Sequence, residues 1–314
     1  MAFHDFKLLK QSVTIHQVLA HHGLADRFTS RGDRLFGPCP IHGGDNKNAF
    51  VVSLSRNLWY CFSGCGRGGD VIDLVRSLDD LSFTQAGDYL ASLASAPPPP
   101  APAASSAPTR NRRPRPFKPF TWKLRLDPKA DLLQRKAITP STASLFEAGA
   151  YLGAGFLQGC VGVRLHDPSG QPLGYAGRRL VPDLARLYGK WKLPAGLPKA
   201  EILFGFHRLP TTLDTAIFLV EGPWSVMRLH QLGIPSVALL GSSLSQTQHR
   251  LLDPFPRLVL LLDGDSTGRS AARRINLSLR HTHDVCVVSL PDGLDPDDLS
   301  DPQLAERLLP ALTP

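Results

Sequence analysis

The sequence predicts an α/β protein of several domains, and three observations support this prediction. The 314 residues are enough for two or three domains of ordinary size. A proline-rich stretch at residues 95–116 separates a shorter N-terminal part from a longer C-terminal part. In the last hundred residues, short apolar segments alternate with amphipathic helical ones, which is typical of a mostly parallel sheet with helices on both faces. We therefore expect a small N-terminal domain, a linker, an α+β subdomain and a Rossmann-like domain.

The charge of the chain favours polyanionic partners. Lysine and arginine number 35 against 27 acidic residues, which gives a net charge of +8, and nucleic acid is the first candidate for such a partner. No apolar run approaches the roughly 20 residues that span a bilayer. The N-terminus also lacks the pattern of a signal peptide. We expect a cytoplasmic protein without a membrane partner.

Residues 95–118 are expected to form the linker. Eight prolines in 95–116 exclude a helix or a central strand and predict an extended, semi-rigid segment. No acidic residue occurs from Tyr89 to Leu126, whereas arginines and lysines are frequent there. The proline-rich half is interpreted as a solvated spacer. The basic half has two interpretations, a spacer or a segment that contacts phosphates.

Clustered cysteines in the N-terminal part predict a metal site. Residues 5–23 have helical spacing that ends at Gly23, and residues 49–62 are expected to form two strands of a small sheet. Three thiols and one imidazole match the ligand set of a structural tetrahedral zinc site, and these are Cys39, His42, Cys61 and Cys65. The alternative is a group of buried free cysteines beside an unrelated histidine. Cys160 and Cys286, each in an apolar stretch, are expected to be core thiols.

Carboxylates follow two predicted strands of the C-terminal part. The expected strands cover 216–220, 235–240, 257–263 and 284–290, each followed by a helical segment. Glu221 follows the first strand, and Asp263 and Asp265 end the third. Because the carboxyl ends of parallel strands share one edge of the sheet, these acids should converge there. Unpaired they would repel each other, so we expect them to hold Mg²⁺ or Mn²⁺.

The cysteine-bearing stretch resembles the CHC2 zinc finger of bacterial DnaG-type primases. The motifs that carry the resemblance are "CPIH", "YCFSGCG" and "GDVIDLV", with one extra residue that makes the second pair Cys-x3-Cys. The resemblance implies a zinc-ribbon-like domain that binds single-stranded template. Its candidate template contacts are Arg56, Trp59, Tyr60, Phe62 and Arg67. The alternative for the aromatic residues is packing around a small core.

The C-terminal part resembles the TOPRIM domain of primases, topoisomerases and related nucleases. The resemblance is carried by Glu221-Gly222, by "DGD" at 263–265 and by "LPDGLDPDDL", which adds Asp292, Asp295 and Asp297. It implies catalytic Mg²⁺ at Glu221, Asp263 and Asp265, with Asp295 and Asp297 positioning a second cation. Surface charge at loop ends is the alternative. Ser225 departs from the pattern, because many primases have an acid there.

The middle segment resembles the N-terminal subdomain of the primase polymerase core. A predicted strand, a turn at Pro168-Ser169-Gly170 and a second strand precede "GKWKLPAG" and "ILFGF", the counterpart of a family strand. By this resemblance Arg178 and Lys190 line a groove for template and nucleotide phosphates. Their alternative is a solvated hairpin surface. Arg269, near the start of the helix after "DGD", is a further phosphate-binding candidate.

Together these resemblances predict a DNA primase that makes short RNA primers on single-stranded DNA from NTPs. The expected division is a zinc-binding domain at 1–94, a linker at 95–118, a polymerase subdomain at 119–210 and a TOPRIM domain at 211–314. Two alternatives are a TOPRIM nuclease and a non-catalytic single-stranded nucleic-acid-binding protein. Without a Walker A motif or a C-terminal helicase-docking domain, the chain is expected to be a reduced primase of a phage, plasmid or integrated element. A replicative helicase or a single-strand-binding protein is the further candidate partner.

Overall fold

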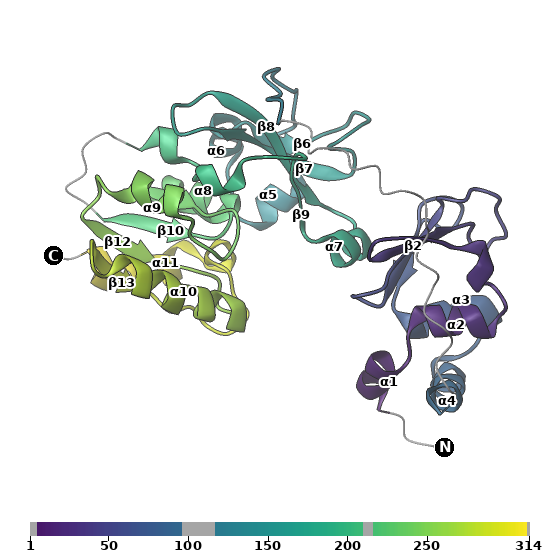
Figure 1. Ribbon diagram of the computed structural model, residues 1–314. Coiled ribbons are helices and arrows are strands. Elements are labelled where there is room, and N and C mark those ends of the chain that lie inside the picture. Colours follow the sequence, from purple (N-terminus) through teal and green to yellow (C-terminus); the bar gives the residue numbers. More distant parts are fainter. Residues whose placement is uncertain (1–4, 96–116, 210–215, 313–314) are drawn as a thin grey trace. The chain divides into compact units, whose positions relative to one another are not determined.

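The computed structural model describes residues 5–95, 117–209 and 216–312 (Figure 1). Nearly all of the predicted linker lies outside these ranges. The chain divides into two compact units, one of residues 1–113 with 179–191 and one of 114–178 with 192–314. Each unit is described by itself. None of the helices in the described ranges combines the length and the apolar character needed to span a bilayer.

Unit 1 is built on a five-stranded antiparallel sheet in the order β1-β2-β3-β4-β5. Its strands are β1 (Thr29–Arg31), β2 (Arg34–Gly37), β3 (Phe50–Ser53), β4 (Leu58–Cys61) and β5 (Gly68–Gly69). The two strands predicted within 49–62 are therefore β3 and β4. Phe50 of β3 stacks on Trp59 of β4, with ring centroids 5.0 Å apart, and both are fully buried in the core.

The N-terminal part of unit 1 also contains the helices α1 (Phe6–Ser12), α2 (Ile15–His21), α3 (Val71–Asp79) and α4 (Phe83–Ala94). Helix α3 contacts β4 and β5, and α2 and α4 pack on α3. The helical stretch predicted at 5–23 is interrupted at Val13 and Thr14, because Thr14 caps α2 with a reciprocal bond to Gln17. Asp70 likewise caps α3. A short 3₁₀ turn, Ala25–Arg27, leads into β1.

A helix from the middle of the chain also packs within unit 1. This helix is α7 (Pro182–Tyr188), and it contacts β4 and β5. The carboxylate of Asp183 accepts a hydrogen bond from the Gly68 N–H at 3.2 Å. Arg56 donates to the Arg186 carbonyl at 2.6 Å, and the Tyr188 ring lies 6.1 Å from the Phe62 ring. Residues 179–191 therefore belong structurally with the finger.

A sheet in the order β6-β7-β8-β9 is formed by β6 (Ala148–Ala150), β7 (Cys160–His166), β8 (Pro172–Arg179) and β9 (Trp191–Lys192). All of its residues belong to unit 2 except Arg179 and Trp191. The predicted turn at 168–170 connects β7 and β8. Helices α5 (Asp131–Arg135) and α6 (Pro140–Leu145) precede β6. The strand expected at "ILFGF" is wrong: only Phe204 makes an isolated bridge to Ala238, between the 3₁₀ turns Lys199–Glu201 and Phe206–Arg208.

The second sheet of unit 2 is parallel and has the order β11-β10-β12-β13. Its strands are β10 (Ile217–Val220), β11 (Ser236–Ala238), β12 (Arg257–Leu260) and β13 (Asp284–Val287). The helices that follow them are α8 (Pro223–Gln231), α9 (Gln246–Leu252), α10 (Ser266–Leu279) and α11 (Asp301–Leu312), the last preceded by the 3₁₀ turn Pro296–Asp298.

The order of the strands puts helices on both faces of the parallel sheet. The connection from β10 to β11 and that from β12 to β13 run in opposite directions across it, so right-handed crossovers place α8 and α10 on opposite faces. Leu252 of α9 and Ile275 of α10 share one buried core cluster with the strands.

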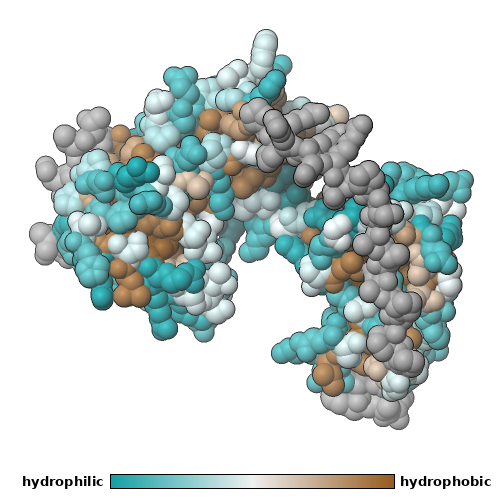
Figure 2. Space-filling model, viewed as in Figure 1, coloured by the Kyte–Doolittle hydropathy of each residue, from teal (hydrophilic) through white to brown (hydrophobic). Residues whose placement is uncertain are grey.

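The surface visible in Figure 2 is largely hydrophilic, with smaller apolar areas on both units. The predicted α/β class is confirmed.

Candidate metal centres

The four predicted zinc ligands lie together in unit 1. Their ligand atoms all lie within 4.8 Å of one another. The Sγ atoms of Cys39 and Cys65 are 3.6 Å apart, and His42 Nδ1 is 3.1 Å from Cys65 Sγ and 3.7 Å from Cys61 Sγ. Cys39 and Cys61 are fully buried, whereas His42 is exposed. The sulfur and imidazole donors match a closed structural zinc site.

The backbone around His42 is shaped to hold the imidazole. A Cβ atom at Gly44 would lie 2.9 Å from His42 Nε2, and one at Gly64 would lie 2.9 Å from its Cδ2. Gly64 is one of the residues inside the unusual Cys-x3-Cys pair, so the longer loop still brings Cys65 to the cluster. Burial and the neighbouring thiols raise the pKa of Cys65 to about 12. Such a thiol ionises only beside a cation, which a zinc ion would supply.

The candidate template contacts of the finger divide by exposure. Trp59 is 1% exposed and donates its indole N–H to the Asp70 carbonyl. Tyr60 is buried, and its hydroxyl donates to the Gly66 carbonyl. The packing alternative therefore holds for both rings. Phe62, at 49% exposed, and Arg67 are exposed to solvent. Arg56 is exposed as well, although its guanidinium already donates to the Arg186 carbonyl.

Glu221 and Asp263 are neighbours at one edge of the parallel sheet in unit 2. Glu221 directly follows β10, and Asp263 comes three residues after the end of the adjacent strand β12. The backbone N–H of Asp263 donates to Glu221 Oε1 at 3.3 Å. A Cβ atom at Gly268 would lie 2.1 Å from the Asp263 carbonyl oxygen and 2.9 Å from Glu221 Oε1. The structure therefore brings Glu221 and Asp263 together, two of the three acids expected to converge.

The environment of Asp263 opposes a negative charge. Burial is the main cause that raises its pKa to about 8, and Glu221, Asp295 and Asp297 add to the effect. These acids belong to both predicted acidic stretches. Among the described residues, only the cysteine and histidine set gathers tightly enough to form a closed ligand cluster. A looser group of carboxylates suits Mg²⁺, which keeps several of its waters.

The backbone ties the two acidic stretches together. Gly264 donates its N–H to the Leu294 carbonyl, and Gly293 donates to the Gly264 carbonyl. A Cβ atom at Gly264 would lie 2.2 Å from the Pro291 carbonyl oxygen, so only glycine fits. Asp265 is exposed and caps α10 by accepting from the Gly268 N–H at 2.7 Å, through one of its two oxygens.

Asp297 is held by two residues that the sequence analysis did not assign to it. Ser225, on α8, donates its hydroxyl to Asp297 Oδ1 at 2.7 Å, and both residues are buried. The Lys136 ammonium lies 2.6 Å from Asp297 Oδ2 and also pairs with Asp298. Lys136 follows α5 in a stretch without a recognisable motif, so nothing in the sequence marked it. Ser225 had been singled out only as a departure from the TOPRIM pattern.

The basic candidates lie in different surroundings. Burial is the main influence on Arg178 and lowers its pKa, while the charges of Asp297, Asp295, Asp263 and Asp298 act in the opposite direction. Arg178 is therefore electrostatically close to the acids, as the predicted phosphate-binding role requires. Arg269 donates to the Gly264 carbonyl and pairs with Asp292 at 2.6 Å. Lys190 is exposed and belongs to unit 1.

The two remaining cysteines differ from one another. Cys160 is buried at the start of β7, as expected of a core thiol. Cys286 is exposed on β13, so the core prediction is wrong there. β13 is the edge strand of the parallel sheet, with β12 as its only neighbour among the described strands, and most of its side chains face solvent.

A thiol and imidazole finger, followed by acids at the ends of parallel strands, defines a protein with a zinc finger and a Toprim-like domain. Comparison with protein families agrees, because residues 3–97 match the family of the CHC2 zinc finger and residues 218–300 match the Toprim-like family. The chain is a homologue of bacterial DNA primases.

Curated relatives and one solved structure support this relationship. The chain is 30% identical to the DNA primase of Aquifex aeolicus over 83% of its own length and 59% of that protein. It is 26% identical to the DNA primase of Geobacillus stearothermophilus over 85% of its length and 53% of the relative. It therefore spans somewhat more than half of these relatives. A crystal structure of the zinc-binding and RNA polymerase domains of the Aquifex aeolicus primase has a TM-score of 0.50 at 24% identity, covering 98% of this chain and 85% of that one, which shows a shared fold.

Proposed function

We propose that this protein is a primase that synthesises short RNA primers on single-stranded DNA by metal-dependent nucleotidyl transfer. The observation that carries the proposal is the proximity of Glu221 and Asp263 at one sheet edge, with Asp295, Asp297 and Arg178 in their electrostatic surroundings. Relatives named DNA primase and the positive net charge support it.

The residues at this edge have separate roles in the proposed reaction. Divalent cations bound there would stabilise the charge that develops as a 3′-hydroxyl displaces pyrophosphate from an incoming nucleotide. Glu221, Asp263 and the free oxygen of Asp265 supply the carboxylate ligands, and Asp295 and Asp297 supply a second acidic group. Arg178 and Arg269 bind phosphates electrostatically. Lys190, which lies in residues 179–191 of unit 1, is proposed to contact template or nucleotide phosphates.

A primer-synthesis assay with Asp263→Asn tests the proposal. Loss of this carboxylate should lower the rate of labelled NTP incorporation on a mixed-sequence single-stranded template by at least about 100-fold, since a metal ligand contributes several kcal/mol to transition-state stabilisation. The matched control is Asp284→Asn. Asp284 is 75% exposed and lies at the amino end of β13, whereas the acids follow the carboxyl ends of the strands of the same sheet. Its substitution should leave the rate unchanged.

Other outcomes of the assay separate the alternatives. Cleavage of labelled DNA with Mg²⁺ in the absence of NTPs, lost in Asp263→Asn, would replace the primase proposal by the nuclease. Binding of single-stranded DNA without any product at any metal would identify a binding protein. Full incorporation by Asp263→Asn would contradict the assignment of the carboxylates.

The proposed activity also indicates where the protein acts and which ligands it meets. A primase works where the DNA template is, so we expect it in the cytoplasm, with single-stranded DNA and NTPs as ligands. The division at 94, 118 and 210, a helicase or single-strand-binding partner, and an origin in a mobile element remain predictions.

A further inference from the structure

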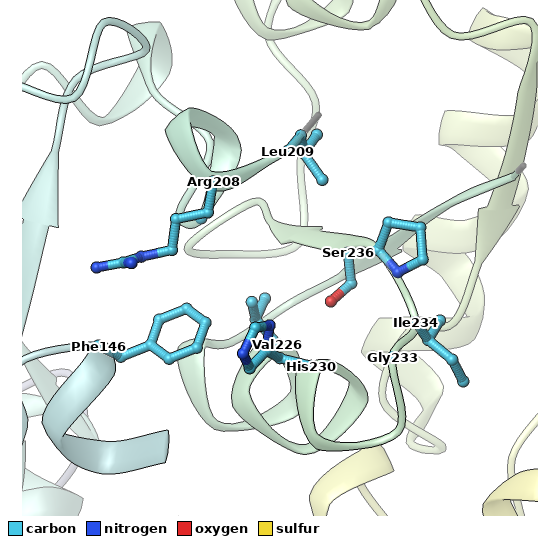
Figure 3. Close-up of a pocket in the computed structure, with 10 residues that line it drawn as sticks. Phe146, Arg208, Leu209, Val226, His230, Gly233, Ile234 and Ser236 are labelled. Atoms are coloured by element: carbon cyan, nitrogen blue, oxygen red, sulfur yellow. The ribbon is translucent and has the colours of Figure 1, made fainter. Parts of the chain in front are cut away.

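A cavity of about 340 Å³ lies in unit 2, apart from the carboxylates (Figure 3). Ser236, the first residue of β11, lines it, whereas Glu221 follows the last residue of the neighbouring parallel strand β10. The cavity therefore lies toward the amino ends of these strands, and the acids lie at their carboxyl ends. Its volume is at the small end of the range for ligand pockets.

Aromatic rings and a guanidinium group form one side of the cavity. The Arg208 guanidinium lies over the Phe146 ring, 4.9 Å from its centroid, and donates to the Leu145 carbonyl at 2.8 Å. The His230 ring meets Phe146 edge-on at 5.2 Å. Figure 3 shows these three side chains around one space. Burial lowers the pKa of the Arg208 guanidinium, and the charge of Glu147 acts in the opposite direction. Glu147 forms ion pairs with Arg164 and Lys123.

A buried hydroxyl without a hydrogen-bond partner lines the same cavity. Ser236 is 6% exposed, and its Oγ finds no partner among the described residues. Buried hydroxyls are nearly always satisfied, so an unsatisfied one at a cavity indicates a missing ligand or water. In Figure 3 its oxygen points toward Val226 and His230, into the space that Phe146 borders.

We propose that this cavity binds a planar aromatic anion of the nucleoside monophosphate class. The Phe146 ring is 3% exposed and already packed between Arg208 and Phe204, so the base packs on the exposed His230 ring and the apolar wall at Val226. The phosphate pairs with Arg208, and a ring nitrogen or carbonyl accepts from the Ser236 hydroxyl. Stacking on the His230 imidazole is indifferent to the identity of the base, whereas the guanidinium requires an anion. The site is independent of the proposed primase activity, because it shares no lining residue with the carboxylates.

Calorimetric titration of the full chain with GMP, without added divalent cation, tests the site. We expect 1:1 binding by the wild-type protein and at least a tenfold loss of affinity in Arg208→Gln. Arg250→Gln, the same change on the exposed face of α9, is the matched control and should bind as the wild type does. Guanosine, which lacks the phosphate, should bind the wild type and Arg208→Gln equally.

Two further variants keep the proposal falsifiable. Ser236→Ala removes a buried hydroxyl that has no partner, so the unliganded protein should melt at an equal or higher temperature while its GMP affinity falls. Asp263→Asn should leave GMP binding intact. Loss of binding in Asp263→Asn would place GMP at the carboxylates and overturn the proposal. Equal affinities of the two arginine variants, or no binding of GMP, AMP or UMP at millimolar concentration, would do the same.

Discussion

Ser225 occupies a position where many members of the resembled family have an acid, and its contact gives the departure a physical meaning. Its hydroxyl donates to Asp297, which also pairs with Lys136. A carboxylate in place of the hydroxyl would lie against Asp297 instead of bonding to it. Asp297 is therefore held by a hydrogen bond from Ser225 and by the Lys136 ammonium group. This site has one negative charge fewer than the family pattern, in which an acid replaces Ser225.

Restoring the acid should make folding depend on cations. Ser225→Asp places two buried carboxylates in contact, so its melting temperature should fall below that of the wild type without divalent cations. Added Mg²⁺ should then raise the melting temperature of the variant more than that of the wild type. Ser225→Ala, which adds no charge, is the control for loss of the hydroxyl. Equal Mg²⁺ responses in Ser225→Asp and the wild type would contradict this account.

Asp263 should give the fold an unusual pH dependence in the absence of divalent cations. Its pKa is about 8 in the folded protein against 3.8 for the unfolded reference, so the folded state binds more protons between these values. Stability from this group is therefore lost as the pH rises from about 4 to about 8. Asp263→Asn removes this contribution. Urea denaturation across this pH range should show the stability of the wild type falling relative to Asp263→Asn, and parallel curves would contradict the prediction.

At the scale of elements, the glycines that follow Glu221 and Asp263 differ in whether the fold requires them. The sequence analysis identified both motifs without distinguishing their glycines. A Cβ atom at Gly264 would lie 2.2 Å from the Pro291 carbonyl oxygen, whereas one at Gly222 would meet nothing within 4 Å. Only Gly264 lies where the backbones of two acidic segments approach each other closely.

Alanine substitution at each glycine tests this distinction. Gly264→Ala should cost about 1–3 kcal/mol of stability, because the Cβ forces the two loops apart. Gly222→Ala should change the free energy of unfolding by less than about 0.5 kcal/mol. Chemical denaturation measures both. Similar losses in the two variants would show that the spacing around Gly264 relaxes freely.

The elements that the sequence predicted well are those with a strong local signal. The four parallel strands correspond to short apolar runs bounded by turn residues, each followed by a helical segment. The zinc ligands and the acids follow from the same local motifs. Lys136 and the contacts of Ser225 could not be predicted, because each depends on residues that are far away in the chain. The break at Thr14 depends on a cap that competes with continuous helical spacing.

At the scale of the whole molecule, the finger includes a helix that sequence order assigns elsewhere. The domain boundaries expected from composition place residues 179–191 far from the finger, but α7 packs on β4 and β5. The sequence could not predict that α7 packs on the finger, because packing between segments that are distant in the chain leaves no periodic pattern in either segment. A finger cut at residue 113 therefore lacks the cover that Asp183 and Tyr188 provide.

A peptide of residues 179–191 should bind and stabilise the isolated fragment 1–113. The Tyr188 ring contacts Phe62 and lies 4.3 Å from the Arg34 guanidinium, so a Tyr188→Ala peptide should bind more weakly. Thermal melting of the zinc-loaded fragment with each peptide measures the effect. A melting temperature that the wild-type peptide leaves unchanged would show that α7 adds nothing to the finger.

Helix α8 lies between two places where ligands are expected. Ser225 on this helix contacts Asp297, while Val226 and His230 on the same helix line the cavity. If a ligand at one site shifts this helix, it also changes the other site, and the two occupancies then share one free energy of coupling. The factor by which a bound mononucleotide changes the affinity for the cation must then equal the factor by which the cation changes the affinity for the mononucleotide. Cation binding would in that case respond to the mononucleotide concentration.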